Sequence, residues 1–370
     1  MSVNATVTVD LSALCENAQA IKRTVGDFFC VLKCDAYGHG ITECADALFN
    51  VGYRRFAVYS LEEALKVKSV CQGAEVLILG RTSAKNAEVI IKNGFIQSVF
   101  SEEYAEELSP VSKGMRVHIK LDSGMNRSGF KCGAESIKKA FSRFTGAIEG
   151  IYTHFHSADA DGISLTKREL EGFLVLSTET EDALGYRLFK HAAASACALR
   201  LKSSRLDACR IGLALYGIAP ENCKGLCKLT PVMSFSAPIT AVKTVRKGEN
   251  LGYGCDHSAK NDMLVATVSA GYGNGLPRIL EKHFTPTVQG IRVPFAARIC
   301  MDRCMLDVTS AAAFGRAVRV GDTVSFFGTD RSVCEVSEAE GTVPYETLTR
   351  VGMMNTREYL ALGGKRGRKT

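Results

Sequence analysis

The chain has 370 residues, of which 46% are hydrophobic and 23% charged, and its formal net charge is +7. This length and composition exclude a largely disordered protein and indicate a globular one with room for two domains. No stretch approaches the roughly 18 consecutive apolar residues of a membrane span. Residues 1–11 have no basic and apolar regions typical of a signal peptide, so we expect a cytoplasmic protein.

Cysteine and charge patterns predict neither a metal nor a nucleic-acid site. The 14 cysteines are scattered singly without zinc-site spacing, so we expect reduced thiols and no metal. Part of the positive charge lies in residues 365–369, which we expect to form a flexible, solvated tail. This basic tail has no interleaved aromatic residues, and no nucleic-acid-binding motif occurs elsewhere in the chain.

Eight short apolar runs alternate with helix-like segments along the first 228 residues. We predict strands over Phe28–Leu32, Arg55–Tyr59, Glu75–Leu79, Phe95–Phe100, Arg116–Leu121, Ile148–Tyr152, Tyr186–Lys190 and Leu206–Ile211. The intervening segments, such as Ser60–Val70, Ala84–Asn93 and Ile137–Phe144, have helical spacing and good helix formers. This α/β alternation predicts a (β/α)8 TIM barrel over residues 1–228. An open doubly wound sheet fits less well, because no G-x-G-x-x-G follows the first strand.

The pattern changes near Leu229. Strand-like runs then follow without intervening helices, over Met233–Val242, Met263–Val268, Val293–Ile299 and Thr323–Phe327. One helix is predicted over Tyr345–Leu360. We therefore expect residues 229–370 to form a C-terminal β-strand domain with a late helix and a basic tail.

A single lysine, Lys33, follows the first buried run and precedes a glycine-rich turn. Lysine is rarely buried without a partner, and desolvation lowers its pKa toward neutrality. Such a lysine acts as a nucleophile or base, most often as a Schiff base with an aldehyde. This stretch alone leaves open a surface lysine at a strand end.

Polar side chains gather where the predicted strands end, which is where barrel enzymes carry their chemistry. They are Lys33, Tyr37, Lys120, Asp122, Arg127, His154, His191, Ser195 and Arg210. The loops after strands seven and eight, a common phosphate site, supply Ser195 and the run from Arg210 to Leu213, where Gly212 permits close backbone approach. A lysine and a phosphate site across one barrel mouth suit a phosphorylated aldehyde cofactor.

Motifs along nearly the whole chain resemble those of alanine racemases. Residues 33–40 match the lysine motif Lys-x-x-Ala-Tyr-Gly-His-Gly, which holds pyridoxal phosphate (PLP) in that family. Residues 120–127 are similar to its Lys-x-Asp-Thr-Gly-Met-x-Arg, residues 191–195 to His-Ala-Ala-Asn-Ser and residues 210–216 to Arg-x-Gly-x-x-Leu-Tyr. Further matches lie at residues 252–254, 271–275, 298–302 and 344–346.

The resemblance implies a PLP-dependent alanine racemase that interconverts L- and D-alanine and supplies D-alanine for peptidoglycan. Racemisation needs a base on each face of the substrate. The resemblance implies Lys33 as the base for the D face and Tyr253 of the partner subunit as the base for the L face. It therefore implies a homodimer with shared active sites.

Further roles follow from the same resemblance. It implies cofactor binding by Tyr37, Arg127, His154, Ser195, Arg210, Gly212, Leu213 and Tyr345, with Arg210 at the pyridine nitrogen and His154 behind it. It implies substrate binding by Arg127 and Met301, and an entry corridor of Asp159, His191, Tyr272, Arg278, Arg298 and Val343. Lys120 aligns with a lysine that some members carry carbamylated; pairing with Asp122 or another carboxylate is the alternative.

Three departures from the family pattern bear on substrate range. Asn274 stands where the family has Asp, Ala194 replaces the Asn before Ser195, and residues 353–357 replace an Arg-Val-Pro-Arg ending. A serine or broad-specificity amino-acid racemase is therefore the alternative reading. A decarboxylase or a non-enzymatic PLP carrier fits less well, the latter because the C-terminal domain carries Tyr253 and Met301.

Overall fold

The computed structural model describes residues 4–255, 257–313, 317–360 and 366–369. Contacts divide the chain into two compact units, named here the barrel unit (residues 14–36 and 41–230) and the strand unit (residues up to 13, 37–40 and from 231 onward). The break at residue 230 lies beside the predicted one at 228. The N-terminal segment differs from the predicted division, because β1 (Thr6–Asp10) pairs with strands of the strand unit. The alternation Thr-Val-Thr-Val at residues 6–9 is the sequence pattern that indicates this strand.

The barrel unit is built on eight parallel strands in the order β8-β7-β6-β5-β4-β3-β2-β9. They are β2 (Phe28–Val31), β3 (Arg55–Val58), β4 (Glu75–Ile78), β5 (Ile96–Val99), β6 (Arg116–Lys120), β7 (Ala147–Tyr152), β8 (Phe189–His191) and β9 (Cys209–Ile211). A parallel bridge between His191 and Ala208 links the two ends of the sheet. The eight predicted strands and the TIM barrel are thus confirmed.

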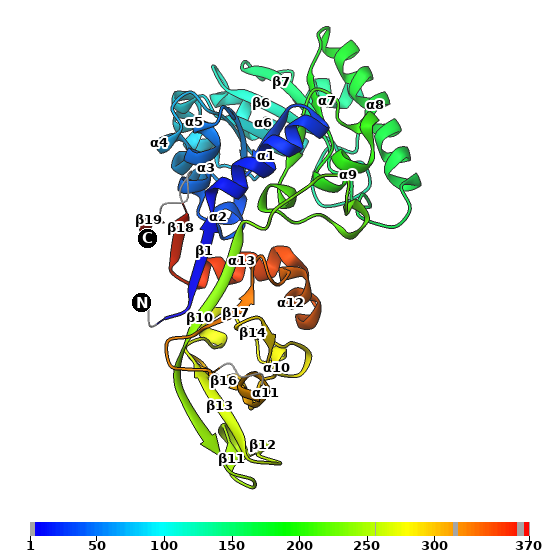
Figure 1. Cartoon of the computed structure of the whole chain (residues 1–370). Coiled ribbons are helices and arrows are strands. Elements are labelled where there is room, and N and C mark those ends of the chain that lie inside the picture. The colour runs from blue at the N-terminus through cyan, green and yellow to red at the C-terminus, as the bar shows by residue number, and fades with distance from the viewer. Residues whose placement is uncertain (1–3, 256, 314–316, 361–365, 370) are drawn as a thin grey trace. The chain divides into compact units, whose positions relative to one another are not determined.

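Helices precede or connect these strands and lie outside them (Figure 1). They are α1 (Leu11–Val25), α3 (Ile41–Asn50), α4 (Leu61–Val70), α5 (Ala87–Asn93), α6 (Glu102–Leu108), α7 (Ala134–Ala140), α8 (Ser164–Leu184) and α9 (Ser195–Arg200). All residues of β2 and β5 are buried, as expected for parallel strands covered on both faces. Helix α4 begins with a capping box in which Ser60 and Glu63 each bind the other's backbone N–H. Within the described ranges, no helix combines the length and apolar composition needed to cross a membrane.

Nine strands of the strand unit form one sheet, centred on β10 (Met233–Val245). Its other members are β1, β13 (Met263–Val268), β14 (Thr287–Val288), β15 (Ile291–Arg292), β16 (Cys304–Asp307), β17 (Thr323–Phe327), β18 (Arg357–Leu360) and β19 (Arg366–Lys369). A separate hairpin joins β11 (Asn250–Leu251) to β12 (His257–Ser258). Four helices accompany them: α10 (Leu280–His283), α11 (Thr309–Ala313), α12 (Val333–Glu340) and α13 (Pro344–Met354).

Three predictions in this unit are wrong. The predicted strand Val293–Ile299 is irregular apart from a bridge between Phe295 and Leu306, and Pro294 has no N–H to donate to a ladder. The late helix ends at Met354 rather than at Leu360, because Asn355 adopts extended backbone and β18 pairs with β1. Residues 366–369 of the expected flexible tail form β19 on β18; residue 365 lies outside the described residues.

Candidate active site

Lys33 stands two residues after the end of β2, at the start of the short left-handed turn α2 (Lys33–Tyr37). Cys34 to Tyr37 have φ values of 54°, 52°, 55° and 54°. Left-handed backbone costs roughly 1–2 kcal/mol for each non-glycine residue, so other contacts must hold it. Glu63 does so by accepting the Cys34 N–H (2.6 Å), and the Asp35 carboxylate accepts the N–H that opens α3 (2.9 Å). The turn thereby fixes the backbone that carries the Lys33 amine.

The Lys33 amine is half-buried and, among the described residues, has no hydrogen-bond or ion-pair partner. Burial is the main cause of its lowered pKa, and the positive charges of Arg127 and Arg210 lower it further. The amine can therefore lose its proton more readily than a surface lysine. This is the environment expected for a lysine nucleophile or base.

Arg210, at the centre of β9, is 5% exposed and fully committed at its two terminal nitrogens. Nη1 donates to His191 Nδ1 (2.8 Å) and to the His191 carbonyl (3.0 Å). Nη2 donates to the carbonyls of Thr153 (2.5 Å) and Ala192 (2.9 Å). In the described part of the chain, Nε makes no hydrogen bond. It is therefore the one guanidinium nitrogen left to contact a ligand.

Three histidines beside Arg210 are held neutral. His154 Nδ1 lies 3.5 Å from Arg210 Nη2, and burial, assisted by that charge, lowers the pKa of His154 to about 3. Burial also lowers the pKa of His118 to about 3 and that of His191 well below its usual value. Because His191 Nδ1 accepts from Arg210, its Nε2 carries the proton and donates to His118 Nδ1 (2.9 Å). His191 is fully buried, which favours a role in orienting Arg210 over the predicted corridor role.

The predicted phosphate loops converge on the Ser195 hydroxyl. Ser195 Oγ accepts hydrogen bonds from the N–H groups of Gly212 (3.2 Å) and Ala214 (3.4 Å). The start of α9 and the turn after β9 therefore bring a hydroxyl and several backbone N–H groups together, with Leu213 between the two donors. Such a cluster suits the oxygens of a phosphate group.

Lys120, at the end of β6, is 8% exposed, and its Nζ lies 2.5 Å from Ser128 Oγ. Burial, followed by the charges of Arg127 and Arg210, lowers the pKa of Lys120 to about 8. Asp122 Oδ1 accepts two backbone N–H groups of the next loop (2.9 and 3.1 Å). Within the described ranges Lys120 forms no ion pair with a carboxylate, so the pairing with Asp122 is not formed.

Two other predicted residues of the barrel unit are exposed. Arg127 lies in the loop after β6 and makes no hydrogen bond or ion pair to any described residue, although its charge acts on Lys33 and Lys120. Asp159 lies in the loop after β7, where its carbonyl accepts from Asn222. The Arg127 guanidinium is thus available to an anionic ligand.

The remaining predicted residues belong to the strand unit. The rings of Tyr37 and Tyr345 lie 5.8 Å apart, centroid to centroid. Beside them, the backbone at Gly38 passes very close to α13. A Cβ added at Gly38 would lie only 2.6 Å from the Leu348 carbonyl oxygen. Only glycine fits this approach, which brings the two tyrosines together.

Several candidate side chains of the strand unit are exposed within a single chain. Tyr253 is 75% exposed on a turn between two glycines with positive φ, and Met301 is 63% exposed. The Tyr272 and Gly273 N–H groups donate to the Cys300 and Met301 carbonyls (2.9 and 2.7 Å), which joins two of the matched motifs. Arg278 and Val343 are also exposed, and Arg298 is half-buried. Large exposed apolar side chains are typical of an interaction surface.

Two of the family departures contact each other. Asn274 Nδ2 donates to Asn355 Oδ1 (2.9 Å), and Asn355 Nδ2 donates to the Asn274 carbonyl (2.9 Å) and the Val351 carbonyl (2.8 Å). Asn274 Oδ1 also accepts from Gly271 N–H (3.1 Å). This amide pair, Asn274 and Asn355, ties the end of α13 to the turn that carries Tyr272.

Sequence reasoning missed three residues of the site. The sequence shows Glu63 as the last residue of a capping pattern that begins at Ser60. It does not show that the Glu63 carboxylate accepts a hydrogen bond from the backbone of the turn after Lys33. His118 is a lone histidine in an apolar strand, with no signal that it meets His191. The Thr153 carbonyl that binds Arg210 is a backbone group, which side-chain patterns do not reveal.

The fold and site together define a TIM-barrel enzyme centred on an unpaired lysine, with a strand-rich second unit. The family model for the alanine racemase N-terminal domain matches residues 9–220, and that for the C-terminal domain matches residues 232–359. The alanine racemase of Methanococcus maripaludis is 33% identical over 368 residues, covering 95% of this chain and 97% of that protein. The chain belongs to the alanine racemase family and is an amino-acid racemase.

Solved structures agree with this assignment. The alanine racemase of Bacillus anthracis with bound L-Ala-P is 30% identical, with a TM-score of 0.88 over 100% of this chain and 98% of that one. The alanine racemase of Bartonella henselae with covalently bound pyridoxal phosphate is 26% identical, with a TM-score of 0.87 over 97% of this chain and 100% of that one. The predicted family and fold are thus confirmed.

Proposed function

We propose that this protein interconverts L- and D-alanine with PLP bound at Lys33. The observation that carries the proposal is the unpaired, half-buried Lys33 amine with its lowered pKa. The same barrel unit holds the Ser195 hydroxyl and the backbone N–H groups around it, which suit a phosphate group. The names of the relatives and the ligands of the two solved structures support it. When bound, PLP withdraws electrons from the substrate and acidifies its α C–H bond.

The residues present fit this cofactor in charge and hydrogen bonding. Ser195 and the Leu213 N–H group would hold the phosphate, and the Gly212 N–H group would exchange its bond to Ser195 Oγ for one to the phosphate. Tyr37 and Tyr345 would be further donors. Arg127, which has no partner among the described residues, would bind the phenolic oxygen and the substrate carboxylate. We assign the N–H of Met301 of the partner subunit to the same carboxylate.

Arg210 Nε would donate to the pyridine nitrogen of the cofactor. Its four hydrogen bonds at the other nitrogens hold the guanidinium plane in place. An arginine stays protonated, so the pyridine nitrogen accepts a hydrogen bond instead of carrying its own proton. This weakens electron withdrawal and restrains side reactions such as transamination.

Two bases move the α-proton. Lys33 serves the D face, and its lowered pKa lets the amine lose its proton more readily than a surface lysine does. Tyr253 of the partner subunit serves the L face. Since Tyr253 is 75% exposed in a single chain, we propose a twofold homodimer in which each subunit completes the other's site. Asp159, Tyr272, Arg278, Arg298 and Val343 would line the substrate entry, with His191 behind Arg210.

We further propose that CO2 carbamylates Lys120. The neutral amine attacks CO2, a C–N bond forms and one proton leaves, which converts a cation into an anion. A pKa of about 8 makes the neutral amine available, and the nearby Arg127 guanidinium gives the anion a partner. The carbamate would hold Arg127 toward the cofactor.

A serine or broader substrate range is the second candidate, because the amide pair replaces the family's usual side chains beside the Tyr272 turn. For the biological setting we propose a cytoplasmic enzyme that supplies D-alanine for peptidoglycan.

The test is chiral analysis of alanine and serine incubated with the purified holoprotein, together with borohydride reduction and peptide mapping. We expect alanine to racemise faster than serine, and the pyridoxyl label to lie on Lys33. Faster turnover of serine would replace the substrate assignment, and a label on another lysine would overturn the site.

A further inference from the structure

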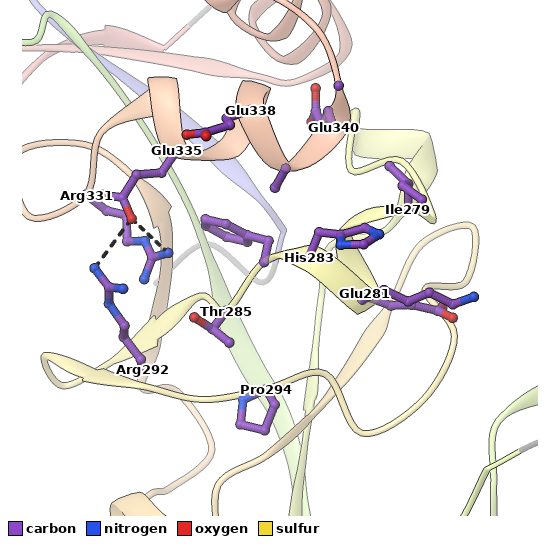
Figure 2. A pocket seen from close by; sticks show the side chains of 14 residues that line it. Ile279, Glu281, His283, Thr285, Arg292, Pro294, Arg331, Glu335, Glu338 and Glu340 are labelled. Atoms are coloured by element: carbon purple, nitrogen blue, oxygen red, sulfur yellow. Dashed lines mark hydrogen bonds and ion pairs between the residues drawn. The ribbon is translucent and has the colours of Figure 1, made fainter.

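The strand unit contains a cleft that the racemase site does not use. It has a volume of about 800 Å³ and is lined by α10, by α12 and by residues 284–285, 292 and 294. Figure 2 shows charged side chains reaching into it from both sides. Its size lies within the range of small-ligand sites, which is roughly 300–1,000 Å³.

Arg331 is the most informative residue of the cleft. It is 5% exposed, and its guanidinium stacks on the Phe284 ring at 4.5 Å from the centroid. Nη2 pairs with Glu335 Oε2 at 3.1 Å. In the described part of the chain, its buried Nε and Nη1 have no hydrogen-bond partner. Burial of such donors is unfavourable unless a ligand or water supplies acceptors.

A second arginine makes this end of the cleft positive. Arg292 Nη2 contacts the same Glu335 oxygen at 3.4 Å, so two guanidinium groups share one carboxylate (Figure 2). One positive charge remains uncompensated by that contact. An added carboxylate would balance this charge and accept a charge-assisted hydrogen bond from Arg331.

The other end of the cleft is acidic. Glu281 Oε2 and Glu340 Oε1 are buried and, among the described residues, accept no hydrogen bond. The second Glu340 oxygen is already bound by Thr347 and Arg350. Figure 2 places Glu281 and Glu340 apart from Arg292 and Arg331, with His283 beside Glu281. Two buried acceptors here require a donor, which an ammonium group provides.

The overall charge favours a zwitterion over a simple anion or cation. Four carboxylates line the cleft (Glu281, Glu335, Glu338 and Glu340) against three permanent cations (Lys282, Arg292 and Arg331). Arg292 and Arg331 lie at one end of the cleft with Glu335 between them, and Glu281 and Glu340 lie at the other end, where Lys282 neighbours Glu281 in α10 (Figure 2). The apolar surfaces of Ile279, Phe284 and Ala339 also line the cleft. A ligand with a negative end, an apolar middle and a positive end would complement this surface.

We propose that this cleft binds a short zwitterionic peptide of two or three residues. The C-terminal carboxylate accepts from Arg331 and Arg292, and the N-terminal ammonium donates to Glu281 and Glu340. A peptide separates its two terminal charges by at least one more residue than a single amino acid does, which suits charges at opposite ends of a cleft. The proposal does not depend on the racemase assignment, because none of these residues belongs to the Lys33 site.

The probe is trialanine, whose termini are its only charges, titrated into the full-length holoprotein by calorimetry after borohydride has fixed the cofactor. We expect one site per chain, and binding at least about tenfold weaker for N-acetyl-trialanine amide, the loss of roughly 1.4 kcal/mol or more. Arg331→Gln and Glu281→Gln should each weaken binding of the uncapped peptide by a similar factor. Single alanine should bind more weakly than trialanine.

Arg331 is buried, so its variant can fail to fold. Arg292→Gln, at a more exposed position, and the capped peptide then test the same end independently. Arg246→Gln is the matched control, because Arg246 forms an exposed pair with Asp262 outside the cleft and should leave binding unchanged. The proposal is overturned if trialanine does not bind, if the capped peptide binds equally well, or if Glu281→Gln and Arg292→Gln bind like the wild type.

Discussion

The lowered pKa of Lys120 leads to a direct test of its carbamylation. With its pKa lowered to about 8, about a quarter of the Lys120 amine is neutral at pH 7.5, against about 0.1% for a lysine at the ordinary 10.5. Neutral amine is the form that reacts with CO2, and its fraction at this site is roughly two orders of magnitude larger than at a surface lysine. We therefore expect wild-type protein equilibrated with 13C-bicarbonate to show one carbamate carbon per chain by NMR.

The matching substitution is Lys120→Ala. Loss of the anion that holds Arg127 should lower kcat/KM for alanine by about 10- to 100-fold, the equivalent of one charge-assisted hydrogen bond. Added acetate should restore part of the activity. Ser128→Ala is the matched control, because it removes the 2.5 Å contact of Lys120 Nζ and leaves the amine in place. A wild-type spectrum without a carbamate carbon, or full activity of Lys120→Ala, would refute the reasoning.

Three further predictions concern stability and assembly. Because burial holds the pKa of His118 and of His154 at about 3, the unfolded chain binds more protons between pH 3 and 6.5, and stability falls as pH falls. Lowering the pH from 7.5 to 5.5 should cost about 1.4 kcal/mol for each ring, measured by urea unfolding. Asn355→Ala removes three hydrogen bonds of the amide pair and should lower the unfolding free energy by about 2–3 kcal/mol. Mixing Lys33→Ala subunits with Tyr253→Phe subunits should restore one intact site per mixed dimer.

Each of these has a contradicting outcome. Equal urea midpoints at the two pH values would show that the barrel histidines are not buried neutral. Asn93→Ala is the control for the amide pair, because Asn93 makes one exposed contact with Val89 at a helix end (2.8 Å) and should cost less. A loss for Asn355→Ala no larger than for Asn93→Ala would show that the pair does not form. Subunits that exchange without regaining activity would contradict shared sites.

The barrel was predictable because its signals are local and repeated. Parallel strands buried on both faces appear as short apolar runs, and all eight were found within a few residues of their observed bounds. The N-terminal β1 was missed because its pairing with β10 and β18 depends on segments more than 200 residues away. Local sequence carries no information on such pairings beyond a strand-like alternation.

The residues of the site that belong to sequence motifs were predictable, whereas the residues that orient them were less so. Lys33, Arg210 and Ser195 stand out as polar groups at strand ends, whereas the partners that orient them come from other elements. Glu63 reaches the lysine turn from α4, and His118 meets His191 across the barrel interior. Such contacts depend on three-dimensional proximity, and only the folded chain reveals them.

We propose that Lys33 and Tyr253 act as separate bases on the two faces of alanine. The most direct measurement is α-proton exchange in deuterated water by the Tyr253→Phe holoprotein, followed by NMR with each pure enantiomer. We expect D-alanine to exchange its α-proton through Lys33, while L-alanine does not exchange. Equal exchange of both enantiomers would contradict the account, because it would show that a group other than Tyr253 is the second base.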